Sequence, residues 1–475
     1  MSAHNFYDII IPSMKKICLI EPKAPGYNIY TFWPLPRLGL PIMGAILKKR
    51  GYEVKIYLQE FSDINYDDVF RSDIVGISTT TSTVPEAYRI AKKVKERGIP
   101  VMMGGVHVTF EADEALDFAD YVIRGEGEET IVELLEAIKT GGSLENIAGL
   151  SYKTHGIKKH NPDRPLLENL DALPFPDLSL IDNNESLKFL HAPIMTSRGC
   201  PFDCTFCSVT QMFGRGYRVR GIESVMEEIK AINRNNYPFI FFYDDNFTAD
   251  RNRTKALLET MIQKNLVKKE WSAQVRIDVA KDKELLGLMK RTKCTFLYIG
   301  FESVNPRTLE LYNKQQKAED MKKYVKILHE YNIKINGMFV LGSDEDTART
   351  VRETVEFAKE AEIDTIQFLI LTPLPGSKIY RQLESQNRLF SKEWEHYDGH
   401  HVVFYPNKMT PHELQTETIK AMRDFYSFSH NAKRLLKSGD WKWFFYKCFA
   451  KYLIKKWERI NRHYYTKLKS KQVQT

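Results

Sequence analysis

The stretch "TSRGCPFDCTFCS", residues 196–208, decides the fold. It places Cys200, Cys204 and Cys207 close together in a chain of 475 residues that has six cysteines in all. Structural zinc usually takes four ligands in paired knuckles, and no second cysteine pair follows nearby. Three thiolates on one loop instead suit a [4Fe–4S] cluster with one iron left unligated. The missing fourth ligand then marks the place where another molecule binds.

The composition is that of an ordinary globular protein, with 43% hydrophobic and 27% charged residues. The length exceeds that of one typical domain, so we expect two or three. The first residues lack the order of a secretory signal, and no apolar run reaches the roughly eighteen residues of a membrane span. The clustered cysteines do not resemble a disulfide framework. We therefore expect a cytoplasmic protein whose thiols are available to metal.

Residues 15–150 alternate between short apolar runs and helical patterns that end in Lys or Arg and Gly. Such repeats predict a parallel, doubly wound, flavodoxin-like sheet that binds its ligand at the carboxyl ends of the strands. The segments "STTTST", "GGVH" and "GEGEE" fall at those ends. Small, hydroxyl-bearing and glycine-rich loops let a bulky ligand approach the backbone closely.

Pro, Asp and Asn are frequent in residues 151–188, which we interpret as a linker. Alternation resumes in residues 189–400, where six apolar runs are each separated by a helix-like stretch. These units predict a partial (β/α)6 barrel, in which the loops after the strands carry the chemistry. Residues 401–475 are expected to form a helical extension rich in basic and aromatic residues.

The cysteine loop resembles the signature of the radical S-adenosylmethionine (SAM) superfamily, in which the spacing is Cys-x3-Cys-x2-Cys with an aromatic residue, here Phe206, before the last cysteine. The resemblance implies that the open iron chelates the amine and carboxylate of SAM. It also implies that the reduced cluster cleaves SAM to a 5′-deoxyadenosyl radical, which takes hydrogen from a substrate. An external electron donor of the flavodoxin or ferredoxin type is implied as well.

Other positions match this superfamily at successive strand ends. Asp244 and Asp245 in "YDDNF" would hold the SAM amine, and Arg276 in "QVRID" would meet the carboxylate. Glu302 in "GFES" would bind the ribose hydroxyls. Taken alone, each carboxylate is better explained as a solvated loop acid, but the order along successive strand ends favours the SAM assignment for Asp245 and Glu302. The resemblance therefore predicts a SAM site made of Phe206, Asp244, Asp245, Arg276 and Glu302.

An α/β domain ahead of the barrel resembles the cobalamin-dependent class, through "PRLGLPIMGAIL", "DIVGIS", "GGVHVTF" and "RGEGEE". The fingerprint Asp-x-His-x-x-Gly is absent, so we expect no protein histidine below the cobalt. His107 stays open between a ligand and a packing residue. Residues 1–199 contain only Cys18, which argues against the methylthiotransferase class with its second cluster. The predicted cobalamin-binding residues are Thr79, Thr80, Ser82, Gly104, Gly105, His107 and Gly125.

The positive charge of the chain lies in its tail. Residues 433–471 hold thirteen Lys or Arg against Asp440 and Glu458, a net +11 in a chain of net +8, so the remainder sums to −3. In segment 441–469 aromatic residues mix with lysines. Two interpretations stay open: peripheral contact with an anionic membrane, and a helix that covers the barrel with a solvated basic side. The slightly acidic body and the lack of a recognition motif predict no nucleic-acid partner.

Together these features predict a cobalamin-dependent radical SAM enzyme with three cofactors: a [4Fe–4S] cluster, SAM and cobalamin. The expected reaction is methylation of an unactivated carbon of a small-molecule or lipid substrate, with a second SAM re-methylating the cobalt. Two alternatives stay open: radical cyclisation or rearrangement without net methylation, and a non-catalytic cluster or cobalamin sensor. The sequence names neither the substrate nor further catalytic residues.

Overall fold

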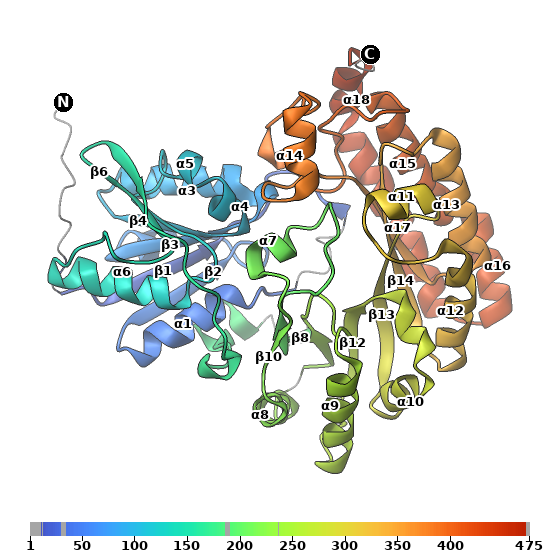
Figure 1. The fold of residues 1–475 in the computed structure, drawn as a ribbon, viewed down its shortest axis with the longest axis horizontal. Helices are drawn as coiled ribbons and strands as arrows, with labels where there is room; N and C mark the ends of the chain where they lie inside the picture. The colour runs from blue at the N-terminus through green and yellow to red at the C-terminus, as the bar shows by residue number, and fades with distance from the viewer. Residues whose placement is uncertain (1–10, 12, 30–34, 186–190, 236, 472–475) are drawn as a thin grey trace.

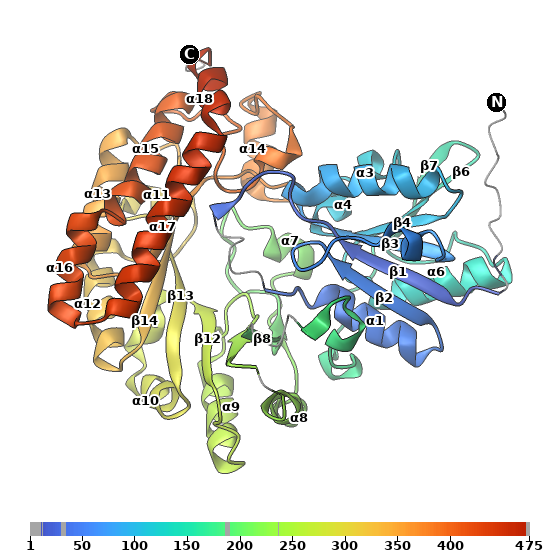
Figure 2. The same ribbon diagram turned by 180° about the vertical axis from the view of Figure 1, so that it is seen from behind.

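The computed structural model describes residues 11, 13–29, 35–185, 191–235 and 237–471. Two α/β bodies stand side by side, the N-terminal sheet in blue and the barrel in green to orange (Figure 1). Viewed from behind, the C-terminal helices lie on the barrel at the side away from the first sheet (Figure 2). The predicted fold class is thereby confirmed.

The first sheet has the strand order β2-β1-β3-β4-β5-β6-β7, with β1 to β5 parallel. The order of its first five strands is that of flavodoxin-like sheets. Helices α1 and α6 cover one face, and α3, α4 and α5 cover the other. The strands are β1 Lys16–Glu21, β2 Glu53–Leu58, β3 Ile74–Thr79, β4 Val101–Gly105, β5 Tyr121–Ile123, β6 Leu150–Thr154 and β7 Ile157–His160. The helices are α1 Gly39–Lys49, α2 Tyr66–Val69, α3 Val84–Lys95, α4 Val106–Phe110, α5 Ala112–Ala115 and α6 Glu128–Thr140.

The segment 151–188, predicted as a linker, contains most of the hairpin formed by β6 and β7. This segment is therefore not all linker. The two strands pair antiparallel on the edge of the first sheet, joined by His155 and Gly156. Both turn residues have positive φ, as a tight two-residue hairpin requires. The hairpin escaped prediction because its strands are short and polar, with no apolar run. The His-Gly pair was the available signal.

The second sheet is an open barrel of six parallel strands in the order β15-β14-β13-β12-β11-β8. Its convex face is buried under helices that supply one large hydrophobic core. The strands are β8 His191–Ile194, β11 Phe239–Phe242, β12 Glu270–Val275, β13 Cys294–Glu302, β14 Lys334–Leu341 and β15 Thr365–Ile370. The main helices are α8 Ile222–Asn233, α9 Arg251–Gln263, α10 Lys283–Arg291, α12 Ala318–Glu330 and α13 Ala348–Glu360. Shorter elements are β9 Ser197–Arg198, α7 Val209–Phe213, β10 Arg218–Val219, α11 Pro306–Leu311 and α14 Lys378–Ser385.

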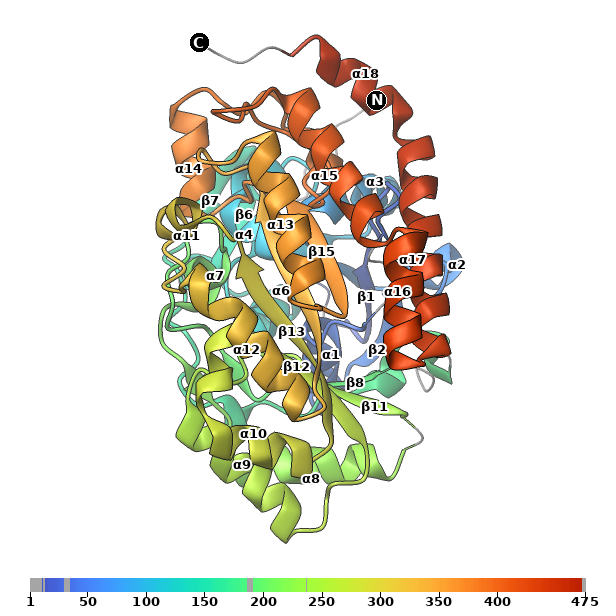
Figure 3. The ribbon, with the colours of Figure 1, turned by 90° about the vertical axis from the view of Figure 1, so that its right-hand side faces the viewer.

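The chain ends in α15 Pro411–Phe425, α16 Phe428–Ser438, α17 Trp441–Ile460 and α18 Arg462–Lys469, which lie together against the barrel (Figure 3). Helix α17 buries Leu453, Ile454 and Trp457 in the barrel core, so it does cover the barrel. Trp441 and Phe445 stay 61% and 64% exposed on the same helix. Among the residues that the structure describes, no helix is long and apolar enough to cross a bilayer.

A buried ion network joins the two bodies. Arg198, on β9, donates to Glu126 at 2.9 Å and to Glu128 at 2.5 Å, and both carboxylates stand at the start of α6 in the first domain. Arg218, on the paired strand β10, donates to the second oxygen of Glu126 at 2.8 Å. The backbone N–H of Leu167 donates to the same oxygen. The two domains are therefore locked together two residues before Cys200.

Replacing Glu126 with Gln should weaken this junction, because it removes one partner of a buried ion network and leaves arginine charge uncompensated. We expect a loss of about 3 kcal/mol in the free energy of unfolding. Scanning calorimetry of the full chain would measure it, with trypsin cleavage between the domains as a second readout. Glu129→Gln is the matched control, because that carboxylate pairs with Arg164 while 61% exposed. Equal losses in the two variants would contradict the assigned role.

Candidate functional site

The cysteine loop runs from β9 to α7 and is held from two sides. Asp203 takes a hydrogen bond on its carbonyl from Asn313 at 3.0 Å and an ion pair from Lys378 at 2.5 Å. Thr205 donates through its N–H and its hydroxyl to the carbonyls at the end of α11. At the start of the loop Gly199 has φ +86°, and a Cβ there would lie 2.3 Å from the Gly216 carbonyl oxygen. Only glycine fits this crossing.

The three thiols of this loop are half-buried and unbridged. Burial raises the pKa of all three, that of Cys207 to about 12. Lys314 and Arg276 act in the opposite direction on Cys204. Among the described residues, no three Cys, His, Asp or Glu side chains meet as ligands of a single ion. A cubane cluster makes a different demand, because each thiolate binds a different iron atom.

Asp244 and Asp245 follow β11 but have different surroundings. Asp244 is 1% exposed and accepts four hydrogen bonds, from the N–H and hydroxyl groups of Thr196 and Ser197, at 2.6–2.9 Å. Its oxygens therefore hold the strand that leads into the cysteine loop and do not line the cavity, so these contacts do not favour the prediction that Asp244 holds the SAM amine. Asp245 faces the cavity described below. Its side chain is exposed to the open space of the cavity, while desolvation by nearby protein atoms, and then the charge of Asp244, raise its pKa to about 6.

Glu302 ends β13 at a bulge against β14 and has φ +64°, an uncommon conformation for a side-chain-bearing residue. Its carboxylate is 2.7 Å from the ammonium of Lys314, and both side chains are 8% exposed. The carboxylate folds back over Gly300, where a Cβ would lie 2.3 Å from Oε1. The glycine of "GFES" thus makes room for the glutamate two positions later.

Arg276 and Phe206 pack within the site and do not line the cavity. The Arg276 guanidinium lies 3.8 Å from the ring centroid of Phe202 and donates to the carbonyls of Lys314 and Gln315. It therefore joins the cysteine loop to the loop after α11. The Phe206 ring meets Tyr312 edge to face at 5.0 Å. Neither side chain lines the cavity between the domains. Both make packing contacts within the site, and their contacts with SAM stay predictions.

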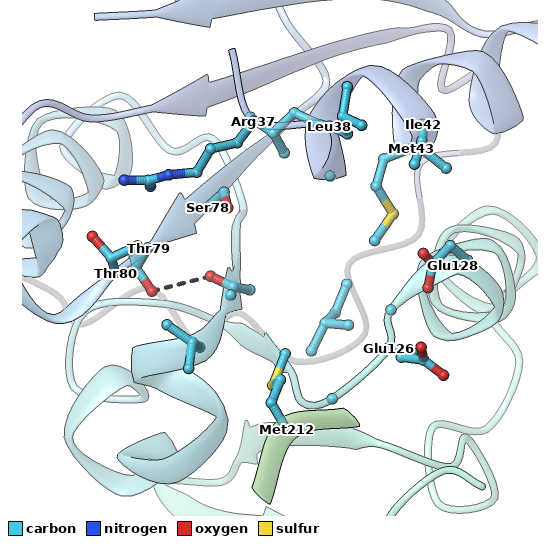
Figure 4. Close-up of a pocket in the computed structure, with 18 of the residues that line it drawn as sticks. Arg37, Leu38, Ile42, Met43, Ser78, Thr79, Thr80, Glu126, Glu128 and Met212 are labelled. Carbon is cyan, nitrogen blue, oxygen red and sulfur yellow. Dashed lines mark hydrogen bonds between the residues drawn. The ribbon is translucent and has the colours of Figure 1, made fainter. Parts of the chain in front are cut away.

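A cavity of about 450 Å³ lies between the two domains. It is bounded by the carboxyl ends of β1, β3 and β4, by the loop before α6, and by the barrel residues next to the cysteine loop. Figure 4 shows Met43 of α1 and Met212 of α7 on opposite sides of it, with Glu126 and Glu128 at one margin. The predicted residues that line it are Thr79, Thr80, Gly104, Gly105 and Gly125.

Two predicted cobalamin residues lie outside this cavity. Ser82 follows Thr80, whose hydroxyl and N–H cap a short turn with Thr83 and direct the chain away. His107 is 1% exposed, and its ring lies 4.9 Å from Trp394, in the turn η7 Trp394–His396. Helix α4 begins directly after β4, so the His107 side chain points away from the cavity and packs against Trp394. The geometry of the cavity therefore gives these two predictions no support, and the contact with Trp394 favours the packing interpretation of His107.

Sequence reasoning also missed side chains that line the cavity. Arg37, just before α1, interacts with Glu21 of β1 and with Tyr243 of the barrel, and the charge of Glu21 raises its pKa. The segments "PRLGLPIMGAIL" and "RGEGEE" carry part of the resemblance, but Gly125 is the one residue within them that the sequence assigns to the site. The missed residues include Arg37, Met43, Glu126, Glu128, Met212 and Tyr243.

The lining fits a large, mostly apolar ring system. Gly105 has φ +102°, and a Cβ there would lie 2.4 Å from the Thr79 carbonyl oxygen. At Gly127 a Cβ would meet Ile123 at 2.7 Å and Met43 at 3.0 Å. Backbone without side chains therefore forms part of the wall, while Thr79 is held by a hydrogen bond from its hydroxyl to the Gly104 carbonyl. The described lining contains no histidine.

Two family models match the chain. Residues 33–135 match the B12 binding domain, and residues 194–358 match the radical SAM superfamily. An uncharacterized methyltransferase of Pyrococcus horikoshii is 34% identical over 430 residues, covering 87% of this chain and 92% of that protein. The bacteriochlorophyllide d C-12(1)-methyltransferase of Chlorobaculum tepidum is 30% identical over 440 residues, covering 91% and 92%.

The fold also has a solved counterpart. The structure of OxsB, a cobalamin-dependent SAM radical enzyme with aqua-cobalamin and SAM bound, superimposes with a TM-score of 0.71. The match covers 95% of this chain and 72% of that chain at 16% identity, a likeness of fold alone. The extended sequence match and the two family domains in order show that the chain belongs to the radical SAM superfamily, that it carries a B12-binding domain before the barrel, and that its relatives include proteins named as methyltransferases.

Proposed function

We propose that the protein is a cobalamin-dependent radical SAM enzyme that methylates an unactivated carbon. The observation that carries the proposal is the cavity between the domains, bounded on one side by the B12-domain loops and on the other by residues that flank the cysteine loop. Arg198 spans this boundary and fixes the two halves relative to each other. The names of the Chlorobaculum and Pyrococcus relatives support methyl transfer.

When bound, the cluster, SAM and cobalamin supply the radical and methyl-transfer chemistry. The chain itself supplies placement and exclusion of water. Cys200, Cys204 and Cys207 would hold three irons. Asp245 would accept the SAM ammonium, because its carboxylate faces the cavity, and Glu302, held by Lys314, would orient the ribose.

Other side chains of the site position residues or loops and are not proposed to contact a cofactor. Asp244 holds the strand that enters the cysteine loop, and Arg276 clamps Phe202. On the cobalamin side, Gly104 and Gly105 would admit the ring edge, and Thr79 would meet its polar periphery. An external one-electron donor of the flavodoxin or ferredoxin type belongs to the proposal, because the chain has no second cysteine cluster to relay electrons.

Anaerobic reconstitution with iron, sulfide and hydroxocobalamin, followed by SAM and a strong reductant, tests the proposal. We expect stoichiometric bound cobalamin, with formation of both 5′-deoxyadenosine and S-adenosylhomocysteine. The Cys204→Ala variant should lose 5′-deoxyadenosine but keep cobalamin, since Cys204 does not line the cavity between the domains. 5′-Deoxyadenosine without bound cobalamin would remove the assignment of the first domain. A cyclase would give 5′-deoxyadenosine without S-adenosylhomocysteine, and a sensor would not need Asp245.

Gly300→Ala should weaken SAM binding although it replaces none of the residues that are predicted to bind SAM. The added Cβ would lie 2.3 Å from Glu302 Oε1 and 2.9 Å from Lys314 Nζ, so the carboxylate must leave its place. Loss of one charge-assisted hydrogen bond predicts a Kd for SAM about tenfold higher. Equilibrium dialysis with reconstituted protein measures it.

Gly287→Ala is the matched control, because a Cβ at this helical position meets nothing within 4 Å. It should leave the Kd unchanged and slightly favour the helix. An unchanged Kd in Gly300→Ala would refute the role of Glu302.

We also propose that the outer face of α16 and α17 contacts anionic membranes. Trp441, Phe444, Phe445 and Phe428 form one cluster of ring contacts with centroids 5.8–6.3 Å apart. Three of these side chains are more than 60% exposed, and the helices also carry many lysines. Exposed aromatics beside lysines are the composition of interfacial helices.

The wild-type chain should sediment with phosphatidylserine-rich vesicles and should dissociate from them in high salt. The double variant Trp441→Ser, Phe445→Ser should bind about tenfold more weakly, because it removes inserted aromatic area. Tyr452→Ser, 57% exposed on the same helix and outside the ring cluster, is the control. Equal binding to anionic and uncharged vesicles, or equal binding by the double variant and the Tyr452→Ser control, would refute the proposed membrane contact.

A further inference from the structure

A second cavity, of about 310 Å³, lies inside the barrel. Its floor is formed by inward-facing residues of the strands, and α17 closes its open side. The described lining is Ile29, Leu35, His191, Phe241, Gln274, Phe296, Tyr298, Asn336, Met338, Thr365, Ile366, Gln367, Met422, Tyr426, Tyr446, Phe449, Ala450, Leu453 and Ile454. A volume of this size is at the lower end for small-molecule sites.

No charged side chain is among the described residues that line this cavity. His191, at the start of β8, keeps part of its surface in solvent, and desolvation of the ring lowers its pKa. Burial likewise raises the pKa of Tyr298 to about 12, so its hydroxyl stays protonated. Transfer of a carboxylate or phosphate into such surroundings is costly, because nothing compensates its charge. The cavity therefore selects an uncharged ligand.

Amide side chains provide the polar groups of the cavity. Gln274, Tyr298, Asn336 and Thr365 are directly paired across four neighbouring strands, so they form one layer, and Gln367 lies two residues further along β15. Asn336 is held by a hydrogen bond from Thr365 at 2.8 Å, and its Nδ2 has no partner. Within the described structure, the side-chain amides of Gln274 and Gln367 make no hydrogen bond to protein. These amides can serve a ligand that carries carbonyl or hydroxyl oxygens.

The two cavities are neighbours. Tyr243 lines the cavity between the domains, and its ring lies 5.9 Å from that of Phe241, which lines the barrel cavity. Phe241 in turn meets Tyr298 edge to face at 5.6 Å. The linings of the two cavities are thus in contact through one pair of aromatic rings, Tyr243 and Phe241.

We propose that the barrel cavity receives the apolar, uncharged part of the substrate, with oxygen groups bound by Gln274 and Gln367, while the reacting end lies at the cavity between the domains. The inference rests on the proposed function for the reaction at that end. It names the substrate class: an extended, uncharged, largely hydrocarbon molecule with carbonyl or hydroxyl oxygen.

Isothermal titration of the full chain with straight-chain methyl ketones of increasing length tests the proposal, with fatty acids of equal length at neutral pH as the charged counterparts. We expect the Kd for ketones to fall about fourfold for each added methylene until the cavity is full. The fatty acids should bind at least about tenfold more weakly than the matching ketones. Affinity that ignores chain length, or fatty acids that bind as well as ketones, would overturn the proposal.

Substitutions in the cavity lining test whether the ketones bind inside the barrel. Ala450→Trp should abolish ketone binding, because Ala450 lines the cavity from α17 and an indole would fill it. Leu453→Phe is a milder filling variant in case the first fails to fold. Tyr452→Trp, 57% exposed on the same helix and outside both the cavity lining and the ring cluster, is the matched control and should bind as the wild type does. The double variant Gln274→Leu, Gln367→Leu should lose about fivefold for ketones and nothing for an alkylbenzene of similar length.

The titration needs neither cluster nor cobalamin, so it is independent of SAM cleavage. Ketone binding that follows the expected pattern in a chain that forms no 5′-deoxyadenosine would refute the proposed function and leave the cavity assignment intact. SAM cleavage in a chain that binds ketones equally well with Ala450→Trp would refute the cavity assignment alone.

Discussion

The buried contact of Arg198 with Glu126 and Glu128 is the constraint on which the site depends. Arg198 and the first cysteine are two residues apart, while the two glutamates flank the start of the helix after the fifth strand. Removing either the arginine or a glutamate lowers the free energy of unfolding, because the remaining buried charge then has no partner. The cysteine loop and the loops of the first domain are therefore placed by the same interaction.

A second principle of the site is that many of its polar residues position others. Asp244 uses both oxygens to hold Thr196 and Ser197, Arg276 clamps Phe202, and Lys378 fixes Asp203. These contacts stiffen a loop that has little hydrophobic burial of its own. The side chains left facing open space, Asp245 above all, can then meet a ligand without first being ordered.

The sequence was enough to predict the parallel strands of both sheets, because alternating strands and helices specify a parallel layer and strand ends specify its ligand side. It was not enough to separate Asp244 from Asp245, which are identical and adjacent. Only the direction of each side chain after the strand distinguishes a buried acceptor from an exposed one. The same limit explains Ser82 and His107, where a turn and a helix start redirect the chain within two residues.

Helix α17 shows why its amphipathic pattern was ambiguous. Its inner side contributes Phe449, Leu453 and Ile454 to the barrel cavity and core, while Trp441 and Phe445 face outward. A helix that is apolar on two sides cannot show a single clean stripe. An exposed apolar patch is unfavourable in water unless something covers it. One helix thus closes a neutral cavity on its inner side and presents aromatic surface on the other, an arrangement suited to a substrate drawn from an apolar phase.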